Sequence, residues 1–193
     1  VYTLAFATAH MVEPPLEATR VYKPDNIIHF PDEKGRIQPY PTYSFAVHVA
    51  QVEVDEETGK VDLQRFGVLH DCGNMINPTF VEGQMHGAAV MGFGAALSEE
   101  SKYDADGTLL ANRFKTYMMP RANEVPMVEI EHQVTPSPFT LLGVKGAGEA
   151  GVGGAAGAIV NAVNDAIRPR GARLRRTPAS PPNVLAALKE AQA

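Results

Sequence analysis

Glycine is concentrated in two segments of this chain, and these segments constrain the fold more than any other feature. Seven glycines fall within the fifteen residues GVKGAGEAGVGGAAG (143–157), and four more interrupt TFVEGQMHGAAVMGFGAALSEE (79–100). The second segment otherwise has the apolar spacing of a helix that starts after Asn77-Pro78. Each interior glycine costs a helix about 1 kcal/mol relative to alanine, so something must approach this backbone closely. The sequence leaves open whether that neighbour is another helix or a bound cofactor.

The segments around the glycines predict strands as well as helices. Residues 43–55 and 60–73 are rich in β-branched and aromatic residues and flank a turn at Gly59, which is typical of a β-hairpin. The further elements that we predict are a short hairpin (101–114), a strand (126–134), a helix (156–167), a basic strand (172–178) and a terminal helix (182–193). We therefore predict an α+β fold in which mixed sheet segments pack with glycine-rich helices.

Six prolines set the first part of the chain apart. They fall between Pro14 and Pro41, where no apolar periodicity is sustained. We predict an extended, loop-rich lead-in over residues 1–42 and one continuous domain over residues 43–193.

The composition excludes several classes of protein. With 45% apolar and 20% charged residues, the 193-residue chain is in the ordinary globular range. Its single cysteine, Cys72, excludes an intrachain disulfide and a cysteine-rich metal site, and fits a small core residue. No stretch of 18 apolar residues is present, so we expect a soluble, cytoplasmic protein without a membrane anchor.

Basic residues cluster near the C-terminal end. Five arginines fall within nine positions (Arg168, Arg170, Arg173, Arg175 and Arg176). They could form a patch for a partner or nucleic acid, or a solvated strand edge whose guanidinium stems cover apolar surface. No aromatic residues interleave with basic ones in a pattern that would bind bases, so we expect no nucleic-acid partner.

The glycine loop contains the pattern G-x-G-x-x-G at Gly146, Gly148 and Gly151. A dinucleotide-binding fold would need further βαβ units after it, and too little of the chain remains. Glu149 lies among these glycines, where a substrate could approach its carboxylate closely. Such a carboxylate is either a general base or the cap of the following helix, and the residues alone leave both open.

Two other apparent sites are weaker. His70, Asp71 and Cys72 are adjacent in a predicted strand, so their side chains point to opposite faces and cannot form a catalytic triad. The six histidines lack the spacing of a zinc site, so we predict no metal ligands from the protein. His86 is interpreted either as a core residue or as a neighbour of a ligand.

Two longer motifs resemble a known family. The segment DCGNMINPTFVEGQMHGAAVMGFGAALSEE and the later LLGVKGAGEAGVGGAAGAIVNAVNDAI are similar to the C-terminal part of the molybdopterin-binding large subunit of the xanthine oxidase family of molybdenum hydroxylases. The resemblance is to its branch of carbon monoxide dehydrogenases and bacterial aldehyde dehydrogenases. It covers roughly residues 40–193.

The resemblance implies roles for individual residues. Gln84 corresponds to a glutamine that hydrogen-bonds the pterin cofactor, for which its amide has both a donor and an acceptor. Glu149 corresponds to the catalytic base, and Gly146 and Gly148 give the backbone room beside the cofactor. The metal would be held by the pterin itself.

The resemblance also implies an activity and partners. The chain would be the C-terminal portion of an enzyme that oxidises an aldehyde, carbon monoxide or an N-heterocycle with oxygen taken from water. Its cofactor would be molybdenum–molybdopterin, with the cytosine dinucleotide form as one option. The remainder of the subunit and partner chains or domains with 2Fe-2S and FAD would complete it, and we expect residues 1–193 alone to be inactive and without molybdenum. The alternative is a structural or assembly module with no catalytic role.

Overall fold

The computed structural model describes residues 18–192, which belong to two compact units, Val1–Pro39 and Tyr40–Ala193. In the first unit, Ile28 and Gln38 form an antiparallel bridge around a turn at Asp32. The start of the predicted lead-in, residues 1–17, lies outside the described residues. The remaining features all belong to the second unit.

A three-stranded mixed sheet forms the base of the second unit. The predicted hairpin is β1 (Phe45–Val54) paired antiparallel with β2 (Val61–Asp71), and Gly59 takes a positive φ of 73° in its turn. Strand β3 (Val128–His132) then pairs with β2 in parallel, in the order β1-β2-β3. The predicted strand at 126–134 is thus confirmed.

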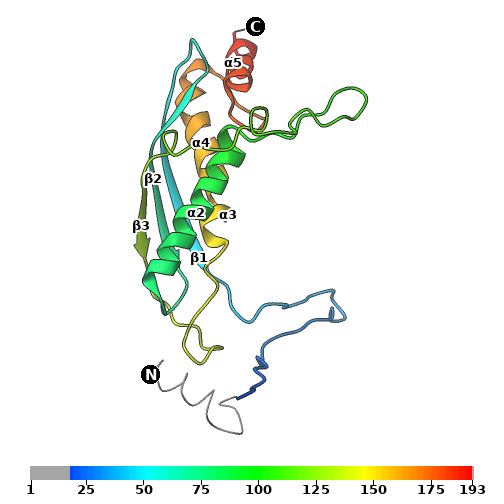
Figure 1. The fold of residues 1–193 in the computed structure, drawn as a ribbon, viewed down its shortest axis with the longest axis vertical. Helices are drawn as coiled ribbons and strands as arrows, with labels where there is room; N and C mark the ends of the chain where they lie inside the picture. Colours follow the sequence, from blue (N-terminus) through cyan, green and yellow to red (C-terminus); the bar gives the residue numbers. More distant parts are fainter. Residues whose placement is uncertain (1–17, 193) are drawn as a thin grey trace, which may run out of the picture. The chain divides into compact units, whose positions relative to one another are not determined.

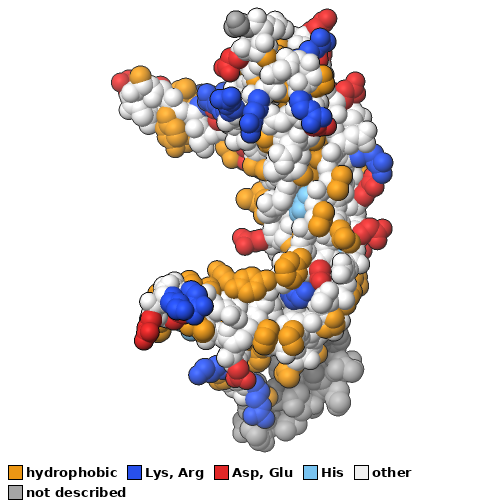
Figure 2. Space-filling model, turned by 180° about the vertical axis from the view of Figure 1, so that it is seen from behind, with side chains coloured by type: hydrophobic (Ala, Val, Ile, Leu, Met, Phe, Trp, Pro, Cys, Tyr) orange, Lys and Arg blue, Asp and Glu red, His pale blue; other side chains and the backbone are white. Residues whose placement is uncertain are grey.

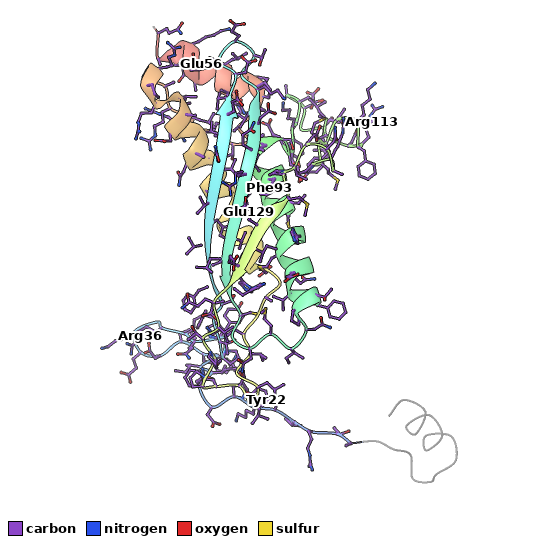
Figure 3. All side chains as sticks on the ribbon, turned by 90° about the vertical axis from the view of Figure 1, so that its left-hand side faces the viewer. Tyr22, Arg36, Glu56, Phe93, Arg113 and Glu129 are labelled. Atoms are coloured by element: carbon purple, nitrogen blue, oxygen red, sulfur yellow. The ribbon has the colours of Figure 1, made fainter. Side chains whose placement is uncertain are left out.

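Helices cover one face of this sheet (Figures 1 and 3). Helix α2 (Pro78–Leu97) connects β2 to β3, and the short α3 (Ala150–Gly153) leads into α4 (Ala155–Ile167). The 3-10 helix η1 (Arg168–Arg170) and α5 (Pro181–Glu190) follow. The predicted α+β class with a mixed sheet and glycine-rich helices is confirmed.

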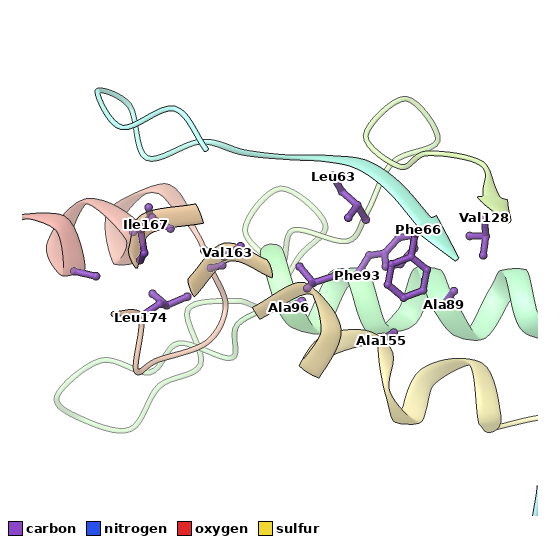
Figure 4. Close-up of a cluster of buried hydrophobic side chains, with 14 of the residues drawn as sticks. Leu63, Phe66, Ala89, Phe93, Ala96, Val128, Ala155, Val163, Ile167 and Leu174 are labelled. Atoms are coloured by element: carbon purple, nitrogen blue, oxygen red, sulfur yellow. The ribbon is translucent and has the colours of Figure 1, made fainter. Parts of the chain in front are cut away.

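The core lies between the sheet and the helices (Figure 4). Phe66 of β2 and Phe93 of α2 meet edge to face, with ring centroids 4.7 Å apart. Alternate residues of the strands and the helical stripe of α4 supply the rest. The fully buried residues of this stripe are Ala155, Ile159, Val163 and Ile167.

The predicted strand at 172–178 is wrong, and the predicted hairpin at 101–114 is present only as a turn with a single bridge. Residues 172–178 alternate in burial, with Ala172 and Leu174 buried and the arginines exposed, but no described strand pairs with them. Segment 101–114 extends away from the end of α2 (Figure 1), and its turn at Gly107 supports only one bridge, between Tyr103 and Leu109. Alternating polarity reports burial, whereas a strand also needs a hydrogen-bonded neighbour.

The arginines of the cluster are exposed, and several basic side chains are visible in the part of the second unit that carries α5 (Figure 2). Arg168 pairs with Asp165 at 2.9 Å, Arg170 with Glu56 at 2.7 Å and Arg176 with Glu100 at 2.8 Å. Because the segment is not a strand, the strand-edge interpretation is wrong.

Candidate functional site

The end of β2 anchors the glycine loop. Residues after β2 run alongside the start of the loop, with Gly73 bridged to Val144 in antiparallel fashion. The backbone N–H of Lys145 donates to the Cys72 carbonyl at 2.7 Å, and the Asn74 side chain donates to the Leu142 carbonyl at 2.8 Å. These bonds fix the start of the loop alongside the end of β2, although more than 60 residues separate the two segments in the sequence.

A buried ion pair reinforces this anchor. Nζ of Lys145 lies 3.1 Å from Oδ1 of Asp71, and their side chains are only 7% and 10% exposed. The same oxygen accepts hydrogen bonds from the N–H groups of Gly73 at 2.8 Å and Thr135 at 3.2 Å. Burial by itself raises the pKa of Asp71, but these donors outweigh it and hold the pKa well below its ordinary value. Asp71 therefore stays ionised and joins three segments.

The far end of the loop is held by β1 and α2. Nε2 of His48 lies 3.1 Å from the Ala150 carbonyl, and its ring packs against Gly154. Gly151 is buried against α2, where a Cβ would lie 2.8 Å from Cβ of Ala88. Only glycine fits at this crossing of α2 and α3.

Gln84 lies beside the loop on the exposed face of α2. A Cβ added at Gly148 would be 3.7 Å from Oε1 of Gln84, so these two predicted site residues are brought together. One stripe of α2 is exposed along its length, at positions 80, 83, 84, 87 and 91. A Cβ at Gly83 or at Gly87 would meet no described atom within 4 Å. This face of α2 therefore offers an amide between two open stretches of backbone.

Glu149 occupies the residue before α3 and is exposed. It is the N-cap residue of α3, but its side chain makes no capping hydrogen bond, so the helix-capping interpretation is right for the position and wrong for the side chain. Gly146 is also exposed, with no described atom within 4 Å of an added Cβ. Gln84, Gly146, Gly148 and Glu149 all lie on α2 or on the loop that packs beside it.

The adjacent His70, Asp71 and Cys72 do not form a triad. The ring nitrogens of His70 have no hydrogen-bond partner among the described residues, while Asp71 bonds the loop. Cys72 is 3% exposed, which confirms it as a core residue, and burial raises the pKa of its thiol.

Three residues that hold the loop escaped the sequence-based prediction of the site, namely Asp71, Lys145 and His48. A lysine inside a glycine-rich loop was the one local signal, since a charged residue among glycines is either solvated or paired. Its partner could not be identified from the sequence because 74 positions separate it from Asp71.

Two properties of residues 18–192 bear on the class of site. Among these residues no three His, Cys, Asp or Glu side chains are grouped so that they could hold a metal ion. In the same range, no helix combines the length and the apolar character that crossing a bilayer requires.

Comparison with known proteins places these residues in a wider context. A family model of the molybdopterin cofactor-binding domain matches residues 2–126. The nicotine 6-hydroxylase large subunit of Paenarthrobacter nicotinovorans is 44% identical over 149 residues, which are 77% of this chain and 18% of that protein. The carbon monoxide dehydrogenase large chain of Hydrogenophaga pseudoflava is 36% identical over 179 residues, which are 93% of this chain and 20% of that protein.

Solved structures of related proteins have the same fold. The structure of reconstituted CO dehydrogenase from Oligotropha carboxidovorans superposes with a TM-score of 0.81 at 33% identity, over 98% of this chain and 22% of that one. The chain therefore spans about a fifth of the length of the relatives that it matches.

Proposed function

Because the chain belongs to the molybdopterin-binding subunits of the xanthine oxidase family, we propose that it forms part of a molybdenum-dependent hydroxylase or dehydrogenase in which Gln84 binds the pterin cofactor and Glu149 is the general base. The observation that carries this proposal is the close approach of Gln84 to the glycine loop at Gly148. The family model ends before that loop, so the role of Glu149 rests on the motif and on the geometry.

The described residues fit the cofactor. The Gln84 amide is exposed between Gly83 and Gly87, where no side chain of the described residues occupies the space above the backbone. A planar ring with donors and acceptors on its edge could approach this face and bond both atoms of the amide. When bound, molybdenum–molybdopterin supplies the two-electron redox chemistry of the enzyme.

Glu149 is suited to moving a proton. Its carboxylate makes no hydrogen bond or ion pair with any other described residue, so both of its oxygens are available to a reacting molecule. Gly148 beside it has no side chain that would keep substrate or water away. Glu149 would accept the proton of the water molecule whose oxygen enters the product.

The substrate and the partners belong to the same proposal. The relatives are named for nicotine and carbon monoxide, and a third is an aldehyde oxidoreductase. We infer an N-heterocycle, carbon monoxide or an aldehyde as substrate. Relatives named as a large subunit and as a subunit gamma of a complex support partner chains, which would supply 2Fe-2S and FAD. A cytosine dinucleotide form of the pterin and a cytoplasmic location complete the proposal.

Replacing Glu149 by Gln tests the assignment in the complete enzyme. The amide keeps the shape of the side chain but cannot accept the proton, so kcat should fall by at least about 100-fold, as is typical for loss of a general base. Molybdenum content, measured on the same preparation, should stay at the wild-type level. The matched control is Glu57→Gln in the exposed β1–β2 turn, which should keep wild-type turnover.

One observation favours the alternative of a structural module. The space beside Gly92 and Gly151 is occupied by other residues of the chain, so packing alone explains why these positions are glycine. Normal turnover of the Glu149→Gln enzyme with full molybdenum content would leave only this structural role.

A further inference from the structure

The loop that carries Glu149 is held by polar contacts at its two ends, whereas the described residues form no hydrogen bond with residues 146–148. Lys145 precedes it and bonds Cys72 and Asp71, whereas Ala150 follows it and bonds His48. Residues 146–148 are Gly, Ala and Gly, and of these only Ala147 packs against the core, through a single methyl group. The place of the Glu149 carboxylate therefore depends mainly on the two ends.

Of the two ends, the Lys145 end carries charges in a buried place. Removing an ammonium and a carboxylate from water is unfavourable, and their attraction offsets this cost only when both are present and bonded. The backbone bond from Lys145 to Cys72 would hold the chain without this ion pair. The ion pair therefore makes a contribution beyond that of the backbone bond.

The ion pair contributes a junction at which three segments of the chain are joined. Oδ1 of Asp71 receives the Lys145 ammonium, the N–H of Gly73 and the N–H of Thr135. The ammonium also lies 5.2 Å from the centre of the Phe45 ring at the start of β1. The end of β2, the segment after β3 and the start of the loop therefore meet at one oxygen atom.

We propose that Asp71 and Lys145 are positioning residues that set the place of Glu149 in the loop that packs beside Gln84. They do not touch the reacting atoms, and they act through the three loop residues that separate Lys145 from Glu149. This inference rests on the proposed function of Glu149, but the anchoring of the loop can be measured separately from turnover.

The test uses the complete enzyme with three variants, Lys145→Met, Asp71→Asn and the double variant. Each single variant leaves one buried charge without its counter-ion, so the loop should shift or loosen. A displacement of about 1 Å of a catalytic group costs up to roughly 100-fold in rate, so we expect kcat to fall 10- to 100-fold with a smaller change in KM. The double variant has no unpaired buried charge and should recover part of the loss.

Amide hydrogen exchange gives a readout that does not depend on turnover. In both single variants, exchange should rise at residues 146–151 and stay unchanged in α4, while molybdenum content stays at the wild-type level. The control is Lys60→Met, which breaks the exposed pair of Lys60 with Asp62, 2.7 Å apart, and should change none of these quantities.

Two results would overturn the proposal. One is wild-type kcat and wild-type exchange in both single variants. The other is loss of molybdenum with increased exchange throughout α2 and α4, which would mean that the pair supports the whole fold. If Glu149→Gln turns over normally, the proposed function fails, whereas increased exchange confined to 146–151 in Lys145→Met still supports the anchoring.

Discussion

Individual glycines have two distinct uses in this chain. Gly92 and Gly151 are places where helices touch, since a Cβ at Gly92 would overlap Ala155 and a Cβ at Gly151 would press on α2. Gly83, Gly87 and Gly146 have nothing described near them. The first group therefore serves packing within the chain, and the second leaves backbone open at the proposed cofactor site.

Gly151→Ala tests the first use. The new Cβ would lie 2.9 Å from the Met85 carbonyl oxygen, so α2 and α3 must move apart. Overpacking of this kind typically costs about 1–3 kcal/mol in the free energy of unfolding, which urea unfolding measures. Gly153→Ala in the same helix meets no described atom within 4 Å and should be neutral or slightly stabilising. Equal effects of the two variants would contradict this account.

At the scale of elements, α2 depends strongly on its first turn. Gly83 and Gly87 weaken its first half without packing against any described residue there, whereas Gly92 and Gly94 are buried in its second half. Asn77 caps the helix through a hydrogen bond to its side chain from the N–H of Phe80 at 3.2 Å, and Pro78 occupies the first position. The segment that presents Gln84 is thus stabilised from its N-terminal end.

Asn77→Ala should loosen that segment. Loss of an N-cap costs about 0.5–2 kcal/mol, and here faster amide exchange is expected in the first two turns of α2. Asn161→Ala, at an exposed position of α4, is the matched control and should leave exchange in α2 unchanged. Unaltered exchange at residues 80–84 in Asn77→Ala would show that the cap is dispensable.

Across the second unit, three histidines lie between strands and helices. His48, His70 and His132 come from β1, β2 and β3, and the rings of His70 and His132 lie 5.9 Å apart. Burial lowers the pKa of His70, with His132, His48 and Lys145 acting in the same direction and Asp71 opposing them. Burial also lowers the pKa of His48, against its bond to Ala150. The folded state therefore disfavours both imidazolium ions.

This arrangement predicts lower stability in mild acid. The unfolded chain binds protons at these histidines near pH 6.5, and the folded chain only at lower pH, so stability falls as the pH drops below 6.5. The slope is at most about 1.4 kcal/mol per pH unit for each histidine. In His70→Leu, urea unfolding as a function of pH should give a shallower slope, whereas His29→Leu at an exposed position should not. An unchanged slope in His70→Leu would refute the prediction.

The sequence alone determined the local elements of this molecule and its family. The hairpin around Gly59, the strand ending near His132 and the helices after Pro78 and Ala155 follow from turn residues and apolar periodicity, which act over a few neighbouring residues. Gln84 and Glu149 were singled out as candidates by motifs of the same local kind. Residues 172–178 show the limit, because their alternation gave burial correctly and strand pairing wrongly.

Only the tertiary structure decided which of these residues meet. The contacts of Lys145 with Asp71, His48 with Ala150 and Gly148 with Gln84 join positions 64 to 102 residues apart. The conformational preferences of neighbouring residues do not determine such contacts, since each contact depends on the register of the strands and the crossing of α2 with α3. The distinction between packed and open glycines also comes from the tertiary structure, because the role of a glycine depends on which atoms lie opposite its Cα.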